Sequence, residues 1–204
     1  MATNGAAASS IVLASGSATR RMMLTSAGVP FEVVVSEFDE DAARSAMGDA
    51  DLAPGDVAEV LARGKAETVS AARPDALVIG GDQILALDDR IFTKPADMDG
   101  ARDTLLALRG KTHTLNCAVC LARGGEVIWS HVDVAHMTMR DFSPEWLGRH
   151  LAAAGPEVCT SVGAYQLEGL GVHLFNKIEG SYFTILGMPL LPLLNQLRDI
   201  GAIA

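Results

Sequence analysis

"LVIGGDQILAL", residues 77–87, is the stretch that most constrains the fold of this 204-residue chain. Its apolar residues flank Gly80, Gly81, Asp82 and Gln83, a pattern typical of a buried strand that carries two polar side chains. A buried carboxylate costs several kcal/mol unless a cation or a hydrogen-bond donor contacts it. We therefore expect Asp82 to have a partner elsewhere in the chain.

The segments around this strand alternate between strand and helix patterns. The first half predicts strands at residues 10–15, 31–41 and 76–87 and helices at residues 17–28, 54–74 and 98–109. Strand 76–87 is expected to turn at Asp88-Asp89 toward "IFTKP". The chain is therefore expected to form one mixed α/β unit with two lobes.

The second half predicts an antiparallel hairpin, a helix and a glycine-rich end. "THTLNCAVCLA" and "EVIWSHVDVAHMTMR" flank Gly124-Gly125, which suits a hairpin turn. Ser143-Pro144 is a helix cap followed by proline at the first helical position. The last third predicts two strands joined at Glu179-Gly180 and a final helix that begins at Pro189.

Composition excludes several classes of protein. A formal charge of −9 argues against binding a nucleic-acid polymer, which needs a basic face. No apolar stretch approaches the ~18 residues of a membrane span, and the N-terminus lacks a basic segment before a hydrophobic one, so we expect a cytoplasmic protein that binds no membrane. Cys117 and Cys120 lie three apart on a predicted strand, where they face opposite sides and cannot share a metal.

The segment "SGSATRR", residues 15–21, offers groups that suit a phosphate. Helix-start N–H groups, the hydroxyls of Ser15 and Ser17, and the guanidinium groups of Arg20 and Arg21 can all bind one. Because cations near a helix N-terminus oppose the helix dipole, two arginines there favour a bound anion. The alternative is a serine-capped helix with solvated arginines, and spacing alone does not separate the two.

Two lysines and two carboxylates are further candidates. Lys65 falls within the apolar stripe of the 54–74 helix, where it either extends to solvent or points its ammonium into a cleft. Lys94 precedes a proline that keeps the backbone extended, and taken alone it is a loop lysine. Asp82 either caps a turn or pairs with an arginine, or else it holds a divalent cation or deprotonates a water molecule. Glu40 supplies a second carboxylate for such a metal.

These pieces, in this order, resemble the Maf family of nucleoside triphosphate pyrophosphatases over about residues 11–198. "SGSATRR" is similar to the family's S-x-S-x-x-R, "SEFDE" to S-x-x-D-E, "LARGKA" to L-A-x-x-K-A, and "GGDQ…KP" to G-x-D-[QT]…K-P. The tail "GAYQLEGLG…KIEGSYFTILGMPL" is similar to the closing G-A-Y and G-x-P-L segments. Each motif alone is weak, but four in order are specific.

The resemblance implies an inosine-triphosphatase-like α/β fold, with an elongated mixed sheet flanked by helices and two lobes around a nucleotide cleft, as a single domain over residues 1–204. It implies hydrolysis between the α and β phosphates of a nucleoside triphosphate, aided by a divalent cation, Mg²⁺ or Mn²⁺. Asp82 would be the general base, with Glu40 and Asp82 as metal ligands. The phosphate-binding residues would be Ser15, Ser17, Arg20, Lys65 and Lys94.

Three positions are thought to track base preference in this family: Thr19, Gln83 and Glu168. The group that prefers 7-methyl-GTP tends to carry Trp, Gln and Glu there, and the group that prefers UTP and dTTP tends to carry Arg, Thr and Gln. Two of three positions match the first group, so we expect 7-methyl-GTP to be preferred. A carboxylate at Glu168 can accept hydrogen bonds from guanine N–H groups and suits a cationic ring.

Other interpretations remain open from the sequence. The same chemistry on UTP or dTTP is one, and a nucleotide-binding regulator of cell division without turnover is another. A plain α/β domain whose polar residues only cap and pair is a third. The aliphatic run "MPLLPLLNQL", residues 188–197, looks exposed and would suit a homodimer.

Overall fold

The computed structural model describes residues 10–48 and 52–204, which are built around a seven-stranded mixed sheet. The strand order is β2 (Glu32–Val33), β1 (Ile11–Leu13), β3 (Leu77–Leu87), β5 (Thr112–Arg123), β6 (Glu126–Met139) and β7 (Phe175–Glu179), with β4 (Arg90–Phe92) paired to β3. β1 pairs in parallel with β2 and β3, and the remaining pairs are antiparallel. The predicted mixed α/β class is confirmed.

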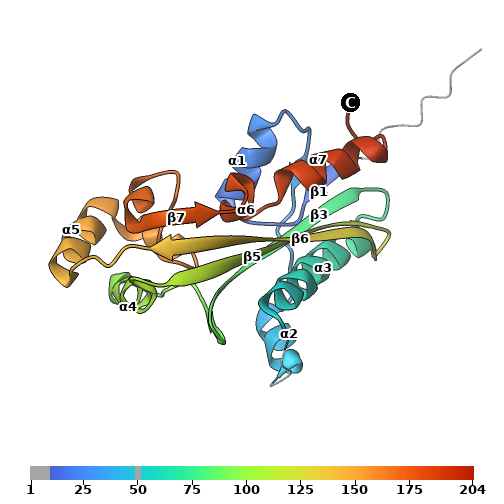
Figure 1. Ribbon diagram of the computed structural model, residues 1–204. Coiled ribbons are helices and arrows are strands. Elements are labelled where there is room, and N and C mark those ends of the chain that lie inside the picture. The colour runs from blue at the N-terminus through green and yellow to red at the C-terminus, as the bar shows by residue number, and fades with distance from the viewer. Residues whose placement is uncertain (1–9, 49–51) are drawn as a thin grey trace, which may run out of the picture.

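Helices cover both faces of this sheet and its far end (Figure 1). α2 (Glu40–Met47) and α3 (Pro54–Ala72) lie on one side, whereas α1 (Ala18–Ser26), α6 (Tyr182–Ile185) and α7 (Leu190–Asp199) lie on the other. α4 (Met98–Leu108) and α5 (Pro144–Ala154) pack at the far end, together with the short 3₁₀ helices η1 (Pro156–Thr160) and η2 (Leu170–Leu174). Each of these three regions has its own cluster of buried apolar residues.

Helix α3 lies unusually close to strand β3. The apolar stripe that predicted this helix is buried, including Val57, Leu61 and Val69. A Cβ atom added at Gly80 would lie 2.3 Å from the carbonyl oxygen of Ala62, so only glycine permits this approach. The contact places the middle of α3 directly over the middle of β3.

Two predicted strands are partly or wholly helical. The strand expected at residues 31–41 contains only Glu32–Val33, and helix α2 begins at Glu40, where the Asp39 side chain accepts a hydrogen bond from the Ala42 N–H at 2.8 Å. The second strand expected after Glu179-Gly180 is instead the short helix α6.

The aliphatic run at residues 188–197 is mostly internal, contrary to its expected exposure. Leu190, Leu193 and Leu197 of α7 are buried in the core, whereas Leu191 is 57% exposed. This face of α7 is therefore used within the chain, and it gives a homodimer no support. Across residues 10–48 and 52–204, no helix combines the length and apolar character needed to traverse a bilayer.

Candidate active site

All of the predicted site residues line one cleft of about 810 Å³. They come from segments far apart in the sequence, and they are Ser15, Ser17, Thr19, Arg20, Glu40, Lys65, Asp82, Gln83, Lys94 and Glu168. The cleft is bordered by the start of α1, by α2, α3 and β3, and by the loops after β4 and after α5. The placement is that expected for a single binding site, whereas the role of each residue stays a prediction.

The partner of Asp82 is Lys65. The Lys65 Nζ atom lies 2.7 Å from Asp82 Oδ1 and 2.9 Å from Glu40 Oε1, so one ammonium bridges both predicted metal-binding carboxylates. The Lys65 side chain is only 13% exposed, which shows that it does not extend to solvent. The second oxygen of Asp82, Oδ2, is buried and makes no hydrogen bond within the described part of the chain.

Two glycines and one aromatic ring set this geometry. Gly80 lets α3 approach β3, which brings Lys65 over Asp82. The Phe38 ring occupies the space beside Gly64, where an added Cβ atom would lie 2.3 Å from its Cζ atom. Because Phe38 precedes α2 by two residues, this contact fixes the start of α2 against α3 and brings Glu40 beside Lys65.

The Arg20 guanidinium is held from two sides at the start of α1. Its Nε atom donates to the Gly187 carbonyl at 2.7 Å, and its Nη1 atom donates to Ser15 Oγ at 3.1 Å. Ser17 is the helix cap, as predicted, and its hydroxyl accepts the Arg20 N–H at 3.3 Å. Arg21 is exposed and does not line the cleft, so the expectation that both arginines bind one phosphate is wrong for Arg21.

The remaining predicted residues lie at different depths. Gln83 is half-buried, and its Nε2 atom donates to the carbonyls of Thr184 at 2.9 Å and Ile185 at 3.1 Å. Lys94 and Glu168 are exposed, and Thr19 is half-buried. Neither Lys94 nor Arg20 forms a salt bridge within residues 10–48 and 52–204, which leaves both cations available to an anionic ligand.

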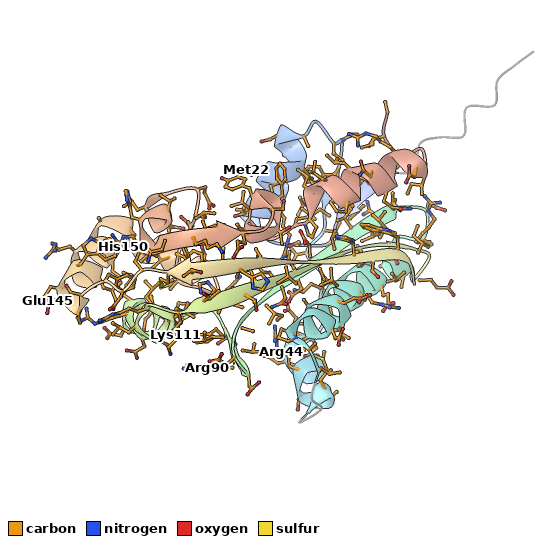
Figure 2. All side chains as sticks on the ribbon, in the orientation of Figure 1. Met22, Arg44, Arg90, Lys111, Glu145 and His150 are labelled. Atoms are coloured by element: carbon orange, nitrogen blue, oxygen red, sulfur yellow. The ribbon has the colours of Figure 1, made fainter. Side chains whose placement is uncertain are left out.

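Arg44 of α2 is a cleft residue that was not predicted. Arg44 is half-buried, lines the cleft and lies on α2 (Figure 2). It forms no salt bridge with any residue that the structure describes. Its spacing of one helical turn after Glu40 is the signal that would have found it, but only once α2 is recognised as a helix.

A buried histidine supports the wall of the cleft beside Tyr165. The Tyr165 hydroxyl lies 2.8 Å from His113 Nε2, and Tyr165 itself lines the cleft. Burial lowers the pKa of His113 to about 4 and raises that of Tyr165, so both groups are neutral at physiological pH. Neither was predicted, because nothing in the sequence connects positions 113 and 165.

The carboxylates suit a metal that is shared with a ligand rather than one held by protein alone. No cluster of three or more His, Cys, Asp or Glu side chains suited to a metal ion occurs among the described residues. Mg²⁺ commonly uses one or two carboxylates together with substrate phosphates and water. The unpartnered Oδ2 of Asp82 fits that mode of binding.

Comparison with known proteins gives a consistent result. Residues 10–200 match the model of a family described as Maf-like protein. A protein from Mesorhizobium japonicum named 7-methyl-GTP pyrophosphatase is 56% identical over 193 residues, which cover 95% of this chain and 97% of the relative. A protein of the same name from Rhizobium etli is 51% identical, with 95% and 97% coverage. A protein from Paramagnetospirillum magneticum named nucleoside triphosphate pyrophosphatase is 53% identical, with 93% and 98% coverage.

Proposed function

This chain belongs to the Maf-like protein family, and from that premise we propose that it is a nucleoside triphosphate pyrophosphatase. It hydrolyses the bond between the α and β phosphates and releases a nucleoside monophosphate and pyrophosphate. The observation that carries the proposal is a buried carboxylate, Asp82, in a cleft that also presents Arg20, Arg44 and Lys94 without salt-bridge partners among the described residues. In a chain with a formal charge of −9, such a group of cations suits a polyanion.

Asp82 acts as the general base in this proposal. It accepts a proton from a water molecule that attacks the α phosphorus, while Lys65 compensates its negative charge from 2.7 Å. Arg20 presents Nη2, the guanidinium nitrogen that is not used by Gly187 or Ser15, to the phosphates. Arg20, Lys65, Lys94 and Arg44 stabilise the negative charge that develops on the pyrophosphate leaving group.

A divalent cation, Mg²⁺ or Mn²⁺, completes the proposed site. Asp82 would hold it through Oδ2, which has no partner in the described residues, and Glu40 would be the second carboxylate ligand. Such an ion would neutralise part of the charge of the triphosphate.

We expect 7-methyl-GTP to be the preferred substrate. Glu168 is an exposed carboxylate in the cleft, where it can accept hydrogen bonds from guanine N–H groups and attract a cationic methylated ring. Relatives from Mesorhizobium japonicum and Rhizobium etli carry that substrate in their names. We place the enzyme in the cytoplasm, where its nucleotide substrates occur.

Pyrophosphate release from a panel of triphosphates tests this proposal. The panel contains 7-methyl-GTP, GTP, UTP and dTTP, each with Mg²⁺ or Mn²⁺, and we expect the highest kcat/KM for 7-methyl-GTP. A higher kcat/KM for UTP and dTTP would keep the reaction but overturn the base preference. Tight binding without turnover of any nucleotide would instead favour a nucleotide-binding regulator.

A further inference from the structure

Two residues outside the cleft are connected to Gln83 through helix α6. Thr184 of α6 is completely buried, and its hydroxyl donates to Asp133 Oδ2 on strand β6 at 2.5 Å. The other oxygen of Asp133 accepts the N–H of Val134 at 2.9 Å. Gln83 in turn donates to the backbone carbonyls of Thr184 and Ile185. Neither Thr184 nor Asp133 lines the cleft.

These hydrogen bonds determine which atom the Gln83 side chain offers to a ligand. Carbonyl oxygens only accept hydrogen bonds, so the amide atom that faces Thr184 and Ile185 must be the nitrogen. With both amide hydrogens used there, Gln83 has only its oxygen left for the cleft. The Gln83 oxygen, Oε1, faces Gly187: a Cβ atom added at Gly187 would lie 3.9 Å from it. The same added atom would lie 3.8 Å from Nη2 of the Arg20 guanidinium.

The position of α6 depends on contacts with the sheet. α6 has four residues, which is too short for a helix to be stable by itself. Gln83 pairs with Cys117 in the sheet, and Cys117 pairs with Asp133, so the two polar side chains lie on the same face two strands apart. Two side chains of the sheet therefore hold α6. Asp133 accepts a hydrogen bond from the Thr184 hydroxyl, and Gln83 donates to the backbone carbonyls of Thr184 and Ile185.

We propose that Thr184 and Asp133 are positioning residues that hold the Gln83 carboxamide with its oxygen toward the nucleotide, where it accepts a hydrogen bond from an N–H group of the base. The proposal rests on the proposed function for the identity of the ligand. If the Thr184–Asp133 bond serves only to stabilise α6, its loss lowers stability and leaves nucleotide affinity unchanged.

A double-mutant cycle tests this inference through the affinity for 7-methyl-GMP, the proposed product, measured by titration calorimetry. The four proteins are the wild type, Thr184→Val, Gln83→Ala and the double variant. Valine matches the shape of threonine but lacks the hydroxyl. We expect Thr184→Val to weaken binding roughly five- to tenfold in the wild type, and less than about twofold when Gln83 is already absent.

Companion variants separate positioning from stability. Thr184→Ser keeps the hydroxyl and should bind 7-methyl-GMP within about twofold of the wild type. Asp133→Ala removes the acceptor and should match Thr184→Val, which keeps the inference testable if Thr184→Val does not fold. For 7-methyl-GTP turnover, Thr184→Val should raise KM and leave kcat nearly unchanged, because the base lies away from the reacting phosphorus.

The inference is overturned if Thr184→Val weakens binding equally with and without Gln83, or if it lowers Tm alone. Because the cycle measures binding of the monophosphate, its outcome does not depend on turnover. A wild type that binds 7-methyl-GMP but hydrolyses no triphosphate would contradict the proposed function, and the cycle would still decide the role of Thr184.

Discussion

Lys65 Nζ lies 2.7 Å from Asp82 Oδ1, and this ion pair joins helix α3 to strand β3 in the wall of the cleft. Both side chains are largely buried, at 13% and 10% exposure. When one partner of such a pair is removed, the other charge stays buried without compensation. The resulting loss of stability is larger than the net contribution of the intact pair. Here Glu40 also contacts Lys65 and limits that cost.

Asp82→Asn separates catalysis from stability. We expect kcat to fall about 10²- to 10⁴-fold, because an amide cannot accept the proton of the attacking water. We also expect the free energy of unfolding to fall by about 1–3 kcal/mol, since Lys65 keeps only Glu40 as a charged partner. Pyrophosphate release and chemical denaturation measure the two effects.

Asp89→Asn is the matched control for that substitution. Asp89 is exposed in the turn between β3 and β4 and does not line the cleft, so kcat should stay within about twofold of the wild type. If Asp82→Asn kept most of its activity, or if Asp89→Asn lost as much, Asp82 would not be the general base.

Neighbouring arginines provide a second comparison. Arg20 is buried at the cleft and Arg21 is exposed outside it, although both lie in the first turn of α1. Arg20→Ala should lower kcat/KM about 10²- to 10³-fold, because it removes a cation placed to stabilise the leaving group. Arg21→Ala should change kcat/KM by less than about twofold. Equal losses in steady-state turnover would show that the phosphates do not bind where we place them.

Glu168 should control the choice of base. Glu168→Gln keeps the size of the side chain and removes its charge, so kcat/KM for 7-methyl-GTP should fall about tenfold, whereas that for UTP should change by less than about twofold. Glu145→Gln serves as the control, because Glu145 lies on α5 and does not line the cleft (Figure 2). An equal loss for both nucleotides would exclude Glu168 from recognition of the base.

Acid should destabilise the fold through His113. Burial lowers the pKa of His113 from 6.5 to about 4, so below pH 6.5 the unfolded chain binds a proton that the folded protein does not. Stability is therefore complete above pH 6.5 and is lost as the pH falls toward 4. When the pH is lowered from 7.5 to 5, the free energy of unfolding of the wild type should fall. The His113→Gln variant lacks the titrating group, so its free energy of unfolding should fall by about 2 kcal/mol less.

Urea denaturation at the two pH values measures this difference. His136→Gln is the control, because His136 is exposed on β6. Equal losses in the wild type and in His113→Gln would mean that His113 is not buried in its neutral form.

Local chemistry made much of the fold predictable. The apolar stripe of α3, the Ser17 and Ser143 caps and the Gly124-Gly125 turn each act over a few residues, and the structure contains each of them. The two wrong strands have different causes. α2 has eight residues and buries none of them completely, so its apolar pattern is short, with only Ala43 and Met47 packed against the core. α6 is rich in residues that favour strands but is attached to Asp133 and Gln83 by hydrogen bonds.

The residues of the site were easier to predict than their contacts. Arg20, Lys65 and Asp82 were conspicuous because each is a charge in an unfavourable local setting. The approach of Lys65 to Asp82 depends on the lack of a side chain at Gly80, and the position of Glu40 depends on Phe38 packing against Gly64. Such long-range contacts leave no periodic pattern in the sequence.

Hydrolysis in ¹⁸O-labelled water tests the central claim most directly. Wild-type enzyme and Asp82→Asn are incubated with 7-methyl-GTP and Mg²⁺, and the products are analysed by mass spectrometry. Attack on the α phosphorus predicts ¹⁸O in 7-methyl-GMP, unlabelled pyrophosphate, and almost no product from Asp82→Asn. Label in pyrophosphate or in inorganic phosphate, or undiminished turnover by Asp82→Asn, would contradict the account.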